Sequence, residues 1–385
     1  MQHDVEVAVI GGGCVGSSTA YNLAKLGCRS VTLFERGHLA WGATGKSSAI
    51  VNVGIWNASK PLVQMLLESI ETFHDFNQKI GGKCGFTQTG WIGITGTEHE
   101  NRIRKVSSLQ NELGVQSSLI SPSAVEQLDP GIFADDLTVA VYEPRSGYAD
   151  PVDTTISFAT NAEKLGAKIL TGVNVTQLVA DGHRITGIKT ENGMVNAKKV
   201  VVAANVWSPK LLRTLGLTVP ISPTRKQVCL FKPAGDTGYP RVVTDDFVND
   251  LYMKPEGDRI LVGEIETPGL PVDPDNFVET IDYDTIPKLA GKLLHRFPAM
   301  SAAVSRGGYA GPYDVSPDGH PILDEIPGYE GLYCAVGFSG HGFRFSPVTG
   351  RLMAELIMDG KTKGVDIEEF RLSRFSEGKP IVPLA

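Results

Sequence analysis

One pattern within the first 35 residues fixes how the fold begins. An apolar run at residues 5–10 leads into Gly11, Gly13 and Gly16, and a helical stretch then connects to a second apolar run at residues 31–35. A strand, a glycine-rich turn, a helix and a second strand in this order are typical of a dinucleotide-binding unit. Gly11 permits the tight turn, Gly13 lets the backbone approach a pyrophosphate, and Gly16 lets the helix lie close to the sheet. The pattern therefore predicts a nucleotide pyrophosphate near the start of the chain.

The end of the second strand indicates which nucleotide is bound. Glu35 is the last residue of this strand, where a carboxylate can accept hydrogen bonds from both hydroxyls of an adenosine ribose. This favours an unphosphorylated ribose, although Arg36 follows directly. The helix that begins near Cys14 directs its free N–H groups and the positive end of its dipole at the phosphates.

Length, charge and cysteine content exclude several classes of protein. A chain of 385 residues is long enough for two domains that share a cleft. Its net charge of −7 argues against nucleic acid as a partner, and no apolar run approaches the roughly 20 residues that cross a membrane. Five scattered cysteines without a C-x-x-C pair predict buried thiols, with neither a disulfide framework nor a metal site. The first strand leaves no room for a signal peptide, so we expect a cytoplasmic protein that acts on a small molecule.

The pattern of elements divides the chain into two interleaved domains. The apolar run at residues 199–208 is typical of a central parallel strand that is buried on both faces. A helical pattern runs from about Pro61 to Ile80, and Ser346 and Pro347 are expected to be the N-cap and first residue of a helix that ends before Gly360. We therefore predict an α/β fold, with a Rossmann-like nucleotide domain and a second α+β domain on a mainly antiparallel sheet. The predicted nucleotide domain comprises 1–84, 150–218 and 306–372; the substrate domain comprises 85–149 and 219–305; and 373–385 form a C-terminal tail.

Four motifs in fixed order carry a resemblance that spans almost the whole chain. They are the glycines at 11–16, a small-residue loop at 42–49, the run at 201–208, and the segment 308–321 that leads to the glycine-rich loop at 337–347. Together they resemble the FAD-dependent D-amino acid oxidase superfamily, in the branch of glycine and sarcosine oxidases and the β subunits of sarcosine oxidase and proline dehydrogenase. The resemblance implies a GR2-type FAD-binding domain, with the adenosine on the first βαβ unit and the flavin ring at the domain interface.

The resemblance also implies which residues hold the cofactor. Besides Gly11, Gly13, Gly16, Glu35 and Arg36, the matching positions are Ala43 and Thr44 on the phosphate side, Lys46, Ser47 and Ser48 on the ring side, Val175, Ala204 and Trp207 at the adenosine, and Gly340, His341, Gly342, Phe343 and Arg344 at the pyrimidine end of the ring. A glycine loop that feeds a helix N-terminus supplies N–H donors and positive potential, which stabilise a reduced flavin anion.

The FAD is expected to be noncovalent. Gly311 and Lys46 stand where relatives carry the cysteine or histidine that attaches the flavin.

Three residues are candidates for catalysis or substrate binding. Arg344 matches the cation that pairs with the substrate carboxylate, and an arginine can do so bidentately; the alternative is a structural ion pair. Tyr252 matches a tyrosine that lies over the substrate, but it could be an ordinary sheet aromatic. His341 could be a general base or a structural histidine. Lys46 could approach flavin N5 or be solvated.

These residues predict an oxidoreductase that removes a hydride from the α-carbon of a small amino acid and passes it to flavin N5. Secondary or N-methylated substrates such as sarcosine and proline, or glycine itself, are favoured. Alternatives are C–O oxidation of a 2-hydroxy acid or glycerol 3-phosphate, a β subunit that needs a partner for turnover, and a nicotinamide enzyme. Leu261 and Ile265 fall where sarcosine oxidases carry an oxygen-activating lysine and a substrate-contacting histidine, so fast reaction with oxygen is in doubt. The sequence leaves homo- or hetero-oligomers open.

Overall fold

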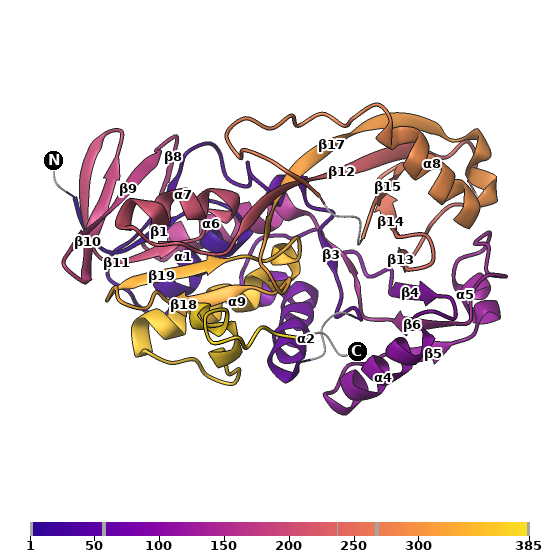
Figure 1. The fold of residues 1–385 in the computed structure, drawn as a ribbon, viewed down its shortest axis with the longest axis horizontal. Helices are drawn as coiled ribbons and strands as arrows, with labels where there is room; N and C mark the ends of the chain where they lie inside the picture. The colour runs from indigo at the N-terminus through magenta and orange to yellow at the C-terminus, as the bar shows by residue number, and fades with distance from the viewer. Residues whose placement is uncertain (1–2, 56–58, 237, 266–268, 383–385) are drawn as a thin grey trace.

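The chain builds two large sheets at opposite ends of an elongated molecule (Figure 1). The computed structural model describes residues 3–55, 59–236, 238–265 and 269–382. Long strands β12 (Ser222–Lys232) and β17 (Val304–Val315) pair with each other and extend between the two ends. The predicted α/β fold with a second, mainly antiparallel sheet is confirmed.

The first sheet is the nucleotide-binding sheet that the N-terminal pattern predicts. Its order is β18-β19-β11-β1-β2-β8, and β19, β11, β1, β2 and β8 pair in parallel. The hairpin of β9 and β10 continues from β11, and β18 adds an antiparallel edge. The strands are β1 (His3–Ile10), β2 (Val31–Glu35), β8 (Lys168–Thr171), β9 (Val175–Asp181), β10 (Arg184–Thr190), β11 (Gly193–Val202), β18 (Ile322–Glu325) and β19 (Leu332–Val336).

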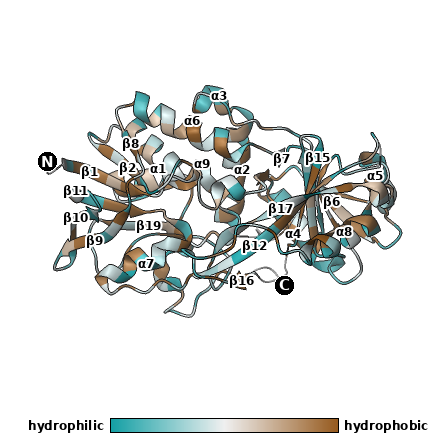
Figure 2. Cartoon of the chain, turned by 90° about the horizontal axis from the view of Figure 1, so that it is seen from above, coloured by the Kyte–Doolittle hydropathy of each residue, from teal (hydrophilic) through white to brown (hydrophobic). Residues whose placement is uncertain are grey.

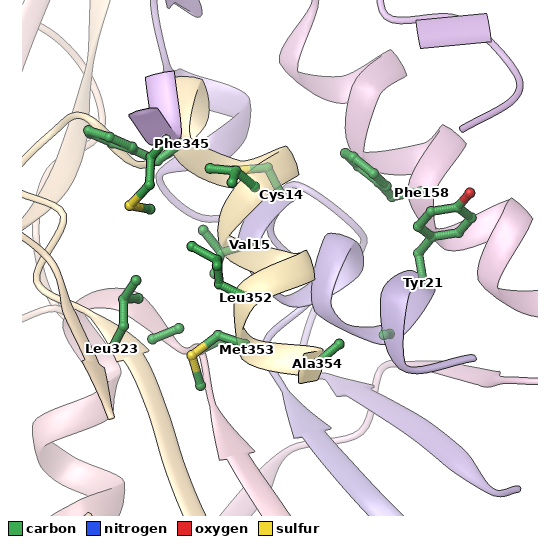
Figure 3. Packing of buried hydrophobic residues seen from close by; sticks show 14 of the residues in the cluster. Cys14, Val15, Tyr21, Phe158, Leu323, Phe345, Leu352, Met353 and Ala354 are labelled. Carbon is green, nitrogen blue, oxygen red and sulfur yellow. The ribbon is translucent and has the colours of Figure 1, made fainter. Parts of the chain in front are cut away.

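Helices cover one face of this sheet because alternate strand residues and helix faces bury a common apolar core. Val7, Val9 and Leu33 point into a cluster with α1 (Cys14–Lys25), α2 (Lys60–His74), α6 (Pro151–Lys164) and α9 (Gly342–Asp359). Figure 3 shows α1 against α9, with Val15 near Leu352 and with Tyr21 facing Phe158. The alternate residues Ala8 and Ile10 face a second cluster with α7 (Ser208–Leu212) and the β9–β10 hairpin.

The second sheet lies at the other end of the molecule. Its order is β16-β12-β15-β14-β13-β4-β6-β5, and β17 joins at β12; among these pairs only β13 and β4 run parallel in the part of the chain described. Helix α8 and α5 pack on one face and α4 on the other. The elements are β4 (Trp91–Thr95), α4 (Glu100–Glu112), β5 (Ser118–Ile120), α5 (Pro122–Leu128), β6 (Val139–Glu143), β13 (Val243–Asp246), β14 (Leu251–Glu256), β15 (Arg259–Gly263), β16 (Leu270–Pro271) and α8 (Thr285–Arg296). Between the two sheets, β3 (Ile50–Val51) pairs with β7 (Gly147–Tyr148).

Three predicted boundaries differ from the structure. Helix α9 begins at Gly342, so Pro347 lies inside the helix although a first-turn position was expected. An earlier start buries Phe343 and Phe345, which outweighs the hydrogen bond that a proline removes. The helical region expected from Pro61 to Ile80 is two helices, α2 and α3 (Phe76–Lys79).

The third difference concerns domain limits. Residues 306–315, assigned from sequence to the nucleotide domain, belong to strand β17 of the second sheet, because pairing with β12 continues over the whole strand. The segment expected as a tail contains Arg374, which is fully buried and pairs with Asp318 at 2.8 Å. The division of the rest of the chain into two domains stays a prediction.

Burial follows hydropathy in both halves. Figure 2 shows hydrophobic residues along the strands of both sheets and hydrophilic ones on outer helices such as α3. All five cysteines are unpaired and buried, as the sequence predicts. Within the described ranges, no helix combines the length and apolar character needed to cross a membrane.

Candidate active site

A cavity of about 420 Å³ lies at the carboxyl ends of β1 and β2, where nucleotide-binding sheets bind their ligand. It is lined by residues that are far apart in sequence and that converge from both ends of the chain. Of the predicted cofactor residues, Gly11, Gly13, Glu35, Arg36, Ala43, Thr44, Ser47, Val175, Ala204, Trp207, Gly340, Gly342 and Phe343 line this cavity.

Each glycine of the first turn lies where a side chain would collide. Gly11 has a φ of +115°, and a Cβ there would lie 2.3 Å from the Ala203 carbonyl oxygen. A Cβ on Gly16 would lie 1.9 Å from the Gly11 carbonyl oxygen, which places α1 directly against the turn. At Gly13 the Cβ would lie 2.9 Å from the Thr44 hydroxyl, which itself accepts a hydrogen bond from the Cys14 N–H at 3.2 Å. The turn is thus closely packed on its protein side, and its backbone faces the cavity.

Glu35 closes the turn from the other side. Its carboxylate accepts hydrogen bonds from the Gly12 and Gly37 N–H groups, both at 2.7 Å. These bonds fix the carboxylate at the cavity wall. Each oxygen retains acceptor capacity for a ribose hydroxyl.

An aromatic and charged cluster closes one end of this cavity. The rings of Trp41 and Trp207 stack at 5.6 Å, and the Arg36 guanidinium lies 4.0 Å from the Trp207 ring centroid. Asp275, from the segment after β16, accepts hydrogen bonds from Arg36 at 3.0 Å, the Trp207 indole at 2.9 Å and Lys210 at 2.7 Å. Lys210 and Arg36 hold the pKa of Asp275 at about 2, so this carboxylate is charged at neutral pH.

The N-termini of two helices face this cavity. Helix α1 has Gly13 as its N-cap and α9 has His341, and neither N-cap residue forms a capping hydrogen bond with its own side chain. In α1 the Cys14 N–H is bound by the Thr44 hydroxyl. Helix starts of this kind offer N–H donors and positive potential to phosphate and to a ring anion. The cradle, the free donors and Glu35 together fit an FAD.

A second cavity, of about 520 Å³, adjoins the first beneath the second sheet. Ser47, Tyr313, Gly340 and Phe343 line both cavities, so the two meet at these residues. The predicted residues Ser48, Tyr252, His341 and Arg344 line the second cavity. The structure therefore brings the three catalytic candidates together beside the place predicted for the flavin ring.

Arg344 carries the positive charge of the second cavity. It is 7% exposed, and one of its nitrogens donates to the Asn52 side-chain oxygen. Its Nε and Nη2 are buried and have no hydrogen-bond partner among the described residues. Burial lowers the pKa of Arg344 to about 10, while Asp245 and Glu143 oppose this shift. The guanidinium therefore stays charged at neutral pH, with donors left for an anion.

A buried carboxylate supports the loop that holds Arg344. Glu143 accepts hydrogen bonds from Val53 N–H at 2.9 Å, Gly54 N–H at 2.8 Å and the Ser146 hydroxyl at 2.7 Å. These bonds fix the segment that begins at Asn52. Burial raises the pKa of Glu143, and its three donors and Arg344 oppose this effect.

Tyr252 and His341 are both uncharged near neutral pH. Burial raises the pKa of Tyr252 well above its ordinary value, with Tyr313 and Tyr309 adding to the shift. Burial and the charge of Arg344 lower the pKa of His341 well below its ordinary value. Tyr252 can therefore donate a hydrogen bond from its hydroxyl, whereas His341 is a weak proton acceptor.

Lys46 lies outside the lining of both cavities among the described residues. Its ammonium group donates to the Trp41 carbonyl oxygen at 3.0 Å and pairs with Glu279 at 3.1 Å. A Cβ on Gly311 would lie 3.0 Å from the Lys46 Cβ, so these two positions are neighbours in the fold. Ile265 lines the second cavity, and Leu261 is buried.

Several residues of the site carry no local sequence signal. Asp245, Asn52 and Lys226 line the second cavity, and Asp275 closes the first. Asp245 is one of two adjacent aspartates in a strand, and only the strand's orientation separates their surroundings. Asp275 lies 239 residues from Arg36, so no motif joins them.

With this geometry in view, the comparisons with known proteins define the class. The family model described as FAD dependent oxidoreductase (DAO) matches residues 6–356, and the chain belongs to this family of enzymes.

Individual relatives resemble the chain along nearly its whole length. The mitochondrial sarcosine dehydrogenase of Mus musculus is 27% identical over 96% of this chain, and the glycine oxidase of Geobacillus kaustophilus is 26% identical over 97% of this chain and 98% of its own length. The crystal structure of L-proline dehydrogenase from P. horikoshii superposes with a TM-score of 0.91 at 27% identity, covering 99% of this chain and all of that one. The chain spans only 41% of the sarcosine dehydrogenase.

Proposed function

We propose that this chain oxidises the C–N bond of a small amino acid, with secondary or N-methylated amino acids such as sarcosine and proline, or glycine, as the favoured substrates. The observation that carries the proposal is Arg344: a buried guanidinium with two unpartnered donors in a cavity that adjoins the dinucleotide cavity. The relatives named sarcosine dehydrogenase, glycine oxidase and L-proline dehydrogenase support this substrate class.

The residues of the second cavity position the substrate. Arg344 binds the carboxylate through Nε and Nη2, which is the bidentate geometry that guanidinium and carboxylate groups prefer. This contact directs the α-carbon and nitrogen toward Gly340 and Phe343, where the two cavities meet. Tyr252 covers the substrate from β14 and offers a neutral hydroxyl. When bound, FAD would be the oxidant, with N5 as the hydride acceptor.

The cofactor is proposed to be noncovalent. Gly311 has no side chain to offer, and Lys46 is engaged by Trp41 and Glu279. Cys14 lines the dinucleotide cavity, but burial raises the pKa of its thiol, so it is a poor nucleophile. We also propose a cytoplasmic location, which the five unpaired cysteines support because thiols persist in reducing compartments.

Arg344→Met tests the substrate anchor. The variant should keep its FAD, but anaerobic flavin reduction by an amino acid should lose about 10²-fold or more in kcat/KM, since truncating a buried charge pair costs roughly 2–5 kcal/mol. Arg184→Met is the matched control, because Arg184 of β10 is exposed, pairs with the exposed Glu330 and lines neither cavity. Rates of bleaching in stopped flow give the comparison. An unimpaired Arg344→Met would contradict the role of this residue.

The same assay separates the other candidate reactions. Bleaching by 2-hydroxy acids or glycerol 3-phosphate, but not by amino acids, would assign C–O oxidation to the site. A fully flavinylated chain without turnover with oxygen or any artificial acceptor would assign a β subunit that depends on a partner.

A further inference from the structure

Two adjacent aspartates in β13 have opposite surroundings. Asp246 is fully buried, and its carboxylate pairs with the Arg296 guanidinium at 2.8 Å on the α8 side of the sheet. Asp245 points to the other face and lines the substrate cavity. It is the cross-strand partner of Tyr252 in β14, so both side chains enter the cavity from the same face.

The groups around Asp245 come from four elements. Arg344 of α9 contributes a positive charge, Glu143 of β6 a negative one, and Tyr252 of β14 and Trp91 of β4 complete the surroundings. Glu143 is already engaged by three donors. Among the described residues no ion pair joins Asp245 to Arg344, and the Arg344 Nε and Nη2 have no hydrogen-bond partner.

A cation and a carboxylate that face one cavity without touching are complementary to a zwitterion. An amino acid whose carboxylate pairs with Arg344 carries its ammonium group two bonds away from that carboxylate's carbon. We propose that Asp245 binds this ammonium group and accepts its proton before the α-carbon is oxidised. This inference rests on the proposed function and extends it by assigning the proton acceptor.

The proton and the hydride that the substrate loses each have an acceptor. The substrate N–H bond breaks and its proton passes to a carboxylate oxygen of Asp245, which leaves a lone pair on nitrogen. The α-C–H bond then breaks, its hydride goes to oxidised FAD, and the lone pair forms the C=N bond. Water hydrolyses the resulting iminium after release.

Acidity supports the same assignment. Burial raises the pKa of Asp245 to about 7, although the Arg344 charge opposes the shift, and an acceptor with a pKa near the working pH is suited to proton transfer. His341, the acceptor considered from sequence, has its pKa lowered well below the ordinary value by burial, Arg344 and His320.

Asp245→Asn tests the inference by comparing two ligands in the FAD-loaded enzyme. The probes are the amino acid that reduces the wild type and its nitrogen-free isostere: propionate for glycine, butanoate for sarcosine and cyclopentanecarboxylate for proline. We expect flavin reduction by the amino acid to fall by about 10²-fold at pH 7. The dissociation constant of the isostere, measured from the change that it causes in the flavin spectrum, should rise less than about threefold or should fall.

The pH profile separates a proton acceptor from a structural residue. In the wild type, reduction should increase as pH rises through about 7, because Asp245 must be ionised to accept a proton. In Asp245→Asn the rise in reduction rate should move to the higher pH at which the substrate amine itself loses its proton. Asp245→Glu should return the rise to near the wild-type pH. If the asparagine variant does not fold, Asp245→Ser provides the same comparison.

Two results would overturn the assignment. If the substitution impairs flavin reduction by the amino acid and binding of the isostere by the same factor, Asp245 is only a counter-ion of Arg344. An unchanged pH profile would exclude proton transfer to Asp245. Failure of the proposed function is distinguishable, because then no amino acid reduces the wild-type flavin, and the inference fails with it.

Discussion

At the scale of single residues, the second cavity is built by close approaches across strands. Tyr252 and Gly263 are cross-strand partners in β14 and β15, and a Cβ on Gly263 would lie 2.5 Å from the Tyr252 hydroxyl oxygen. A glycine here lets the ring lie flat over β15 with its hydroxyl in the cavity. The position of Tyr252 therefore requires that its cross-strand partner, residue 263, be a glycine.

Tyr252→Phe should lower kcat/KM for the amino acid about two- to tenfold while FAD content stays unchanged, because one hydrogen bond to the substrate contributes roughly 0.5–1.5 kcal/mol. The pH profile should keep its shape, since burial raises the Tyr252 pKa and the phenol is neutral throughout the working range. Steady-state kinetics between pH 6 and about 9 check this. A shifted profile would mean that Tyr252, rather than Asp245, governs the proton transfer.

Single residues also show where sequence reasoning ends. Arg344 can be predicted from sequence because it lies in the glycine-rich motif at 337–347. Its position in this motif sets its place in the fold. Asp245 could not be separated from Asp246 by sequence, because the choice of face follows from the register of β13 between β4 and β14. A one-residue shift in register would exchange their roles.

At the scale of elements, the packing of α1 against α9 holds the two ends of the chain together. A Cβ on Gly350 of α9 would lie 2.4 Å from the Ser18 backbone carbon of α1, and Ser18 donates to the Pro347 carbonyl oxygen at 3.4 Å. Both helices direct their N-termini at the dinucleotide cavity. Their spacing therefore sets the geometry of the cofactor site.

Gly350→Ala should destabilise the protein by about 1–3 kcal/mol, the usual cost of overpacking, and should weaken FAD binding. Gly291 of α8 is the matched control, because a Cβ there meets nothing within 4 Å. Gly291→Ala should stabilise by about 0.5–1 kcal/mol. Denaturant unfolding with and without added FAD measures both. A tolerated Gly350→Ala would show that the helices can separate without loss of the site.

The elements themselves were predicted unevenly. The first strand, its glycine turn, α1 and β2 follow from local pattern, because each step has a separate steric requirement. The predicted start of α9 was wrong. The preference of proline for the first turn is weaker than the stabilisation that comes from burying Phe343 and Phe345 in the helix. The domain limit predicted at residue 306 falls inside β17, and local sequence does not show this strand's length because its partner β12 lies about 80 residues earlier.

At the scale of the whole molecule, a segment connected to the second sheet reaches back to the dinucleotide cavity. The segment after β16 carries Asp275 to Arg36, Trp207 and Lys210, and its start pairs with β12 through Leu270 and Pro271. No local pattern predicts this contact, because it joins elements of both sheets. It closes one end of the dinucleotide cavity.

Asp275→Asn should raise the FAD dissociation constant about tenfold, since charge-assisted hydrogen bonds contribute roughly 1.5–3 kcal/mol and this site is partly exposed. Asp258→Asn, which removes the exposed pair with Lys232, is the control. Fluorescence titration of the apoprotein checks the affinity, and high salt should narrow the difference. Because the Asp275 pKa is depressed to about 2, the wild-type contact is complete above about pH 4 and is lost as pH falls through 2. Equal affinities of variant and wild type would remove this segment from cofactor binding.

The central claim is that an amino acid anchored at Arg344 delivers a hydride across the junction of the two cavities. The most direct test is the visible absorbance of the flavin in the purified protein, followed without oxygen while sarcosine, glycine and proline are added in turn. We predict a yellow protein that at least one of these amino acids bleaches. A flavin spectrum that stays unchanged with all three and with a wider amino acid panel would contradict the account.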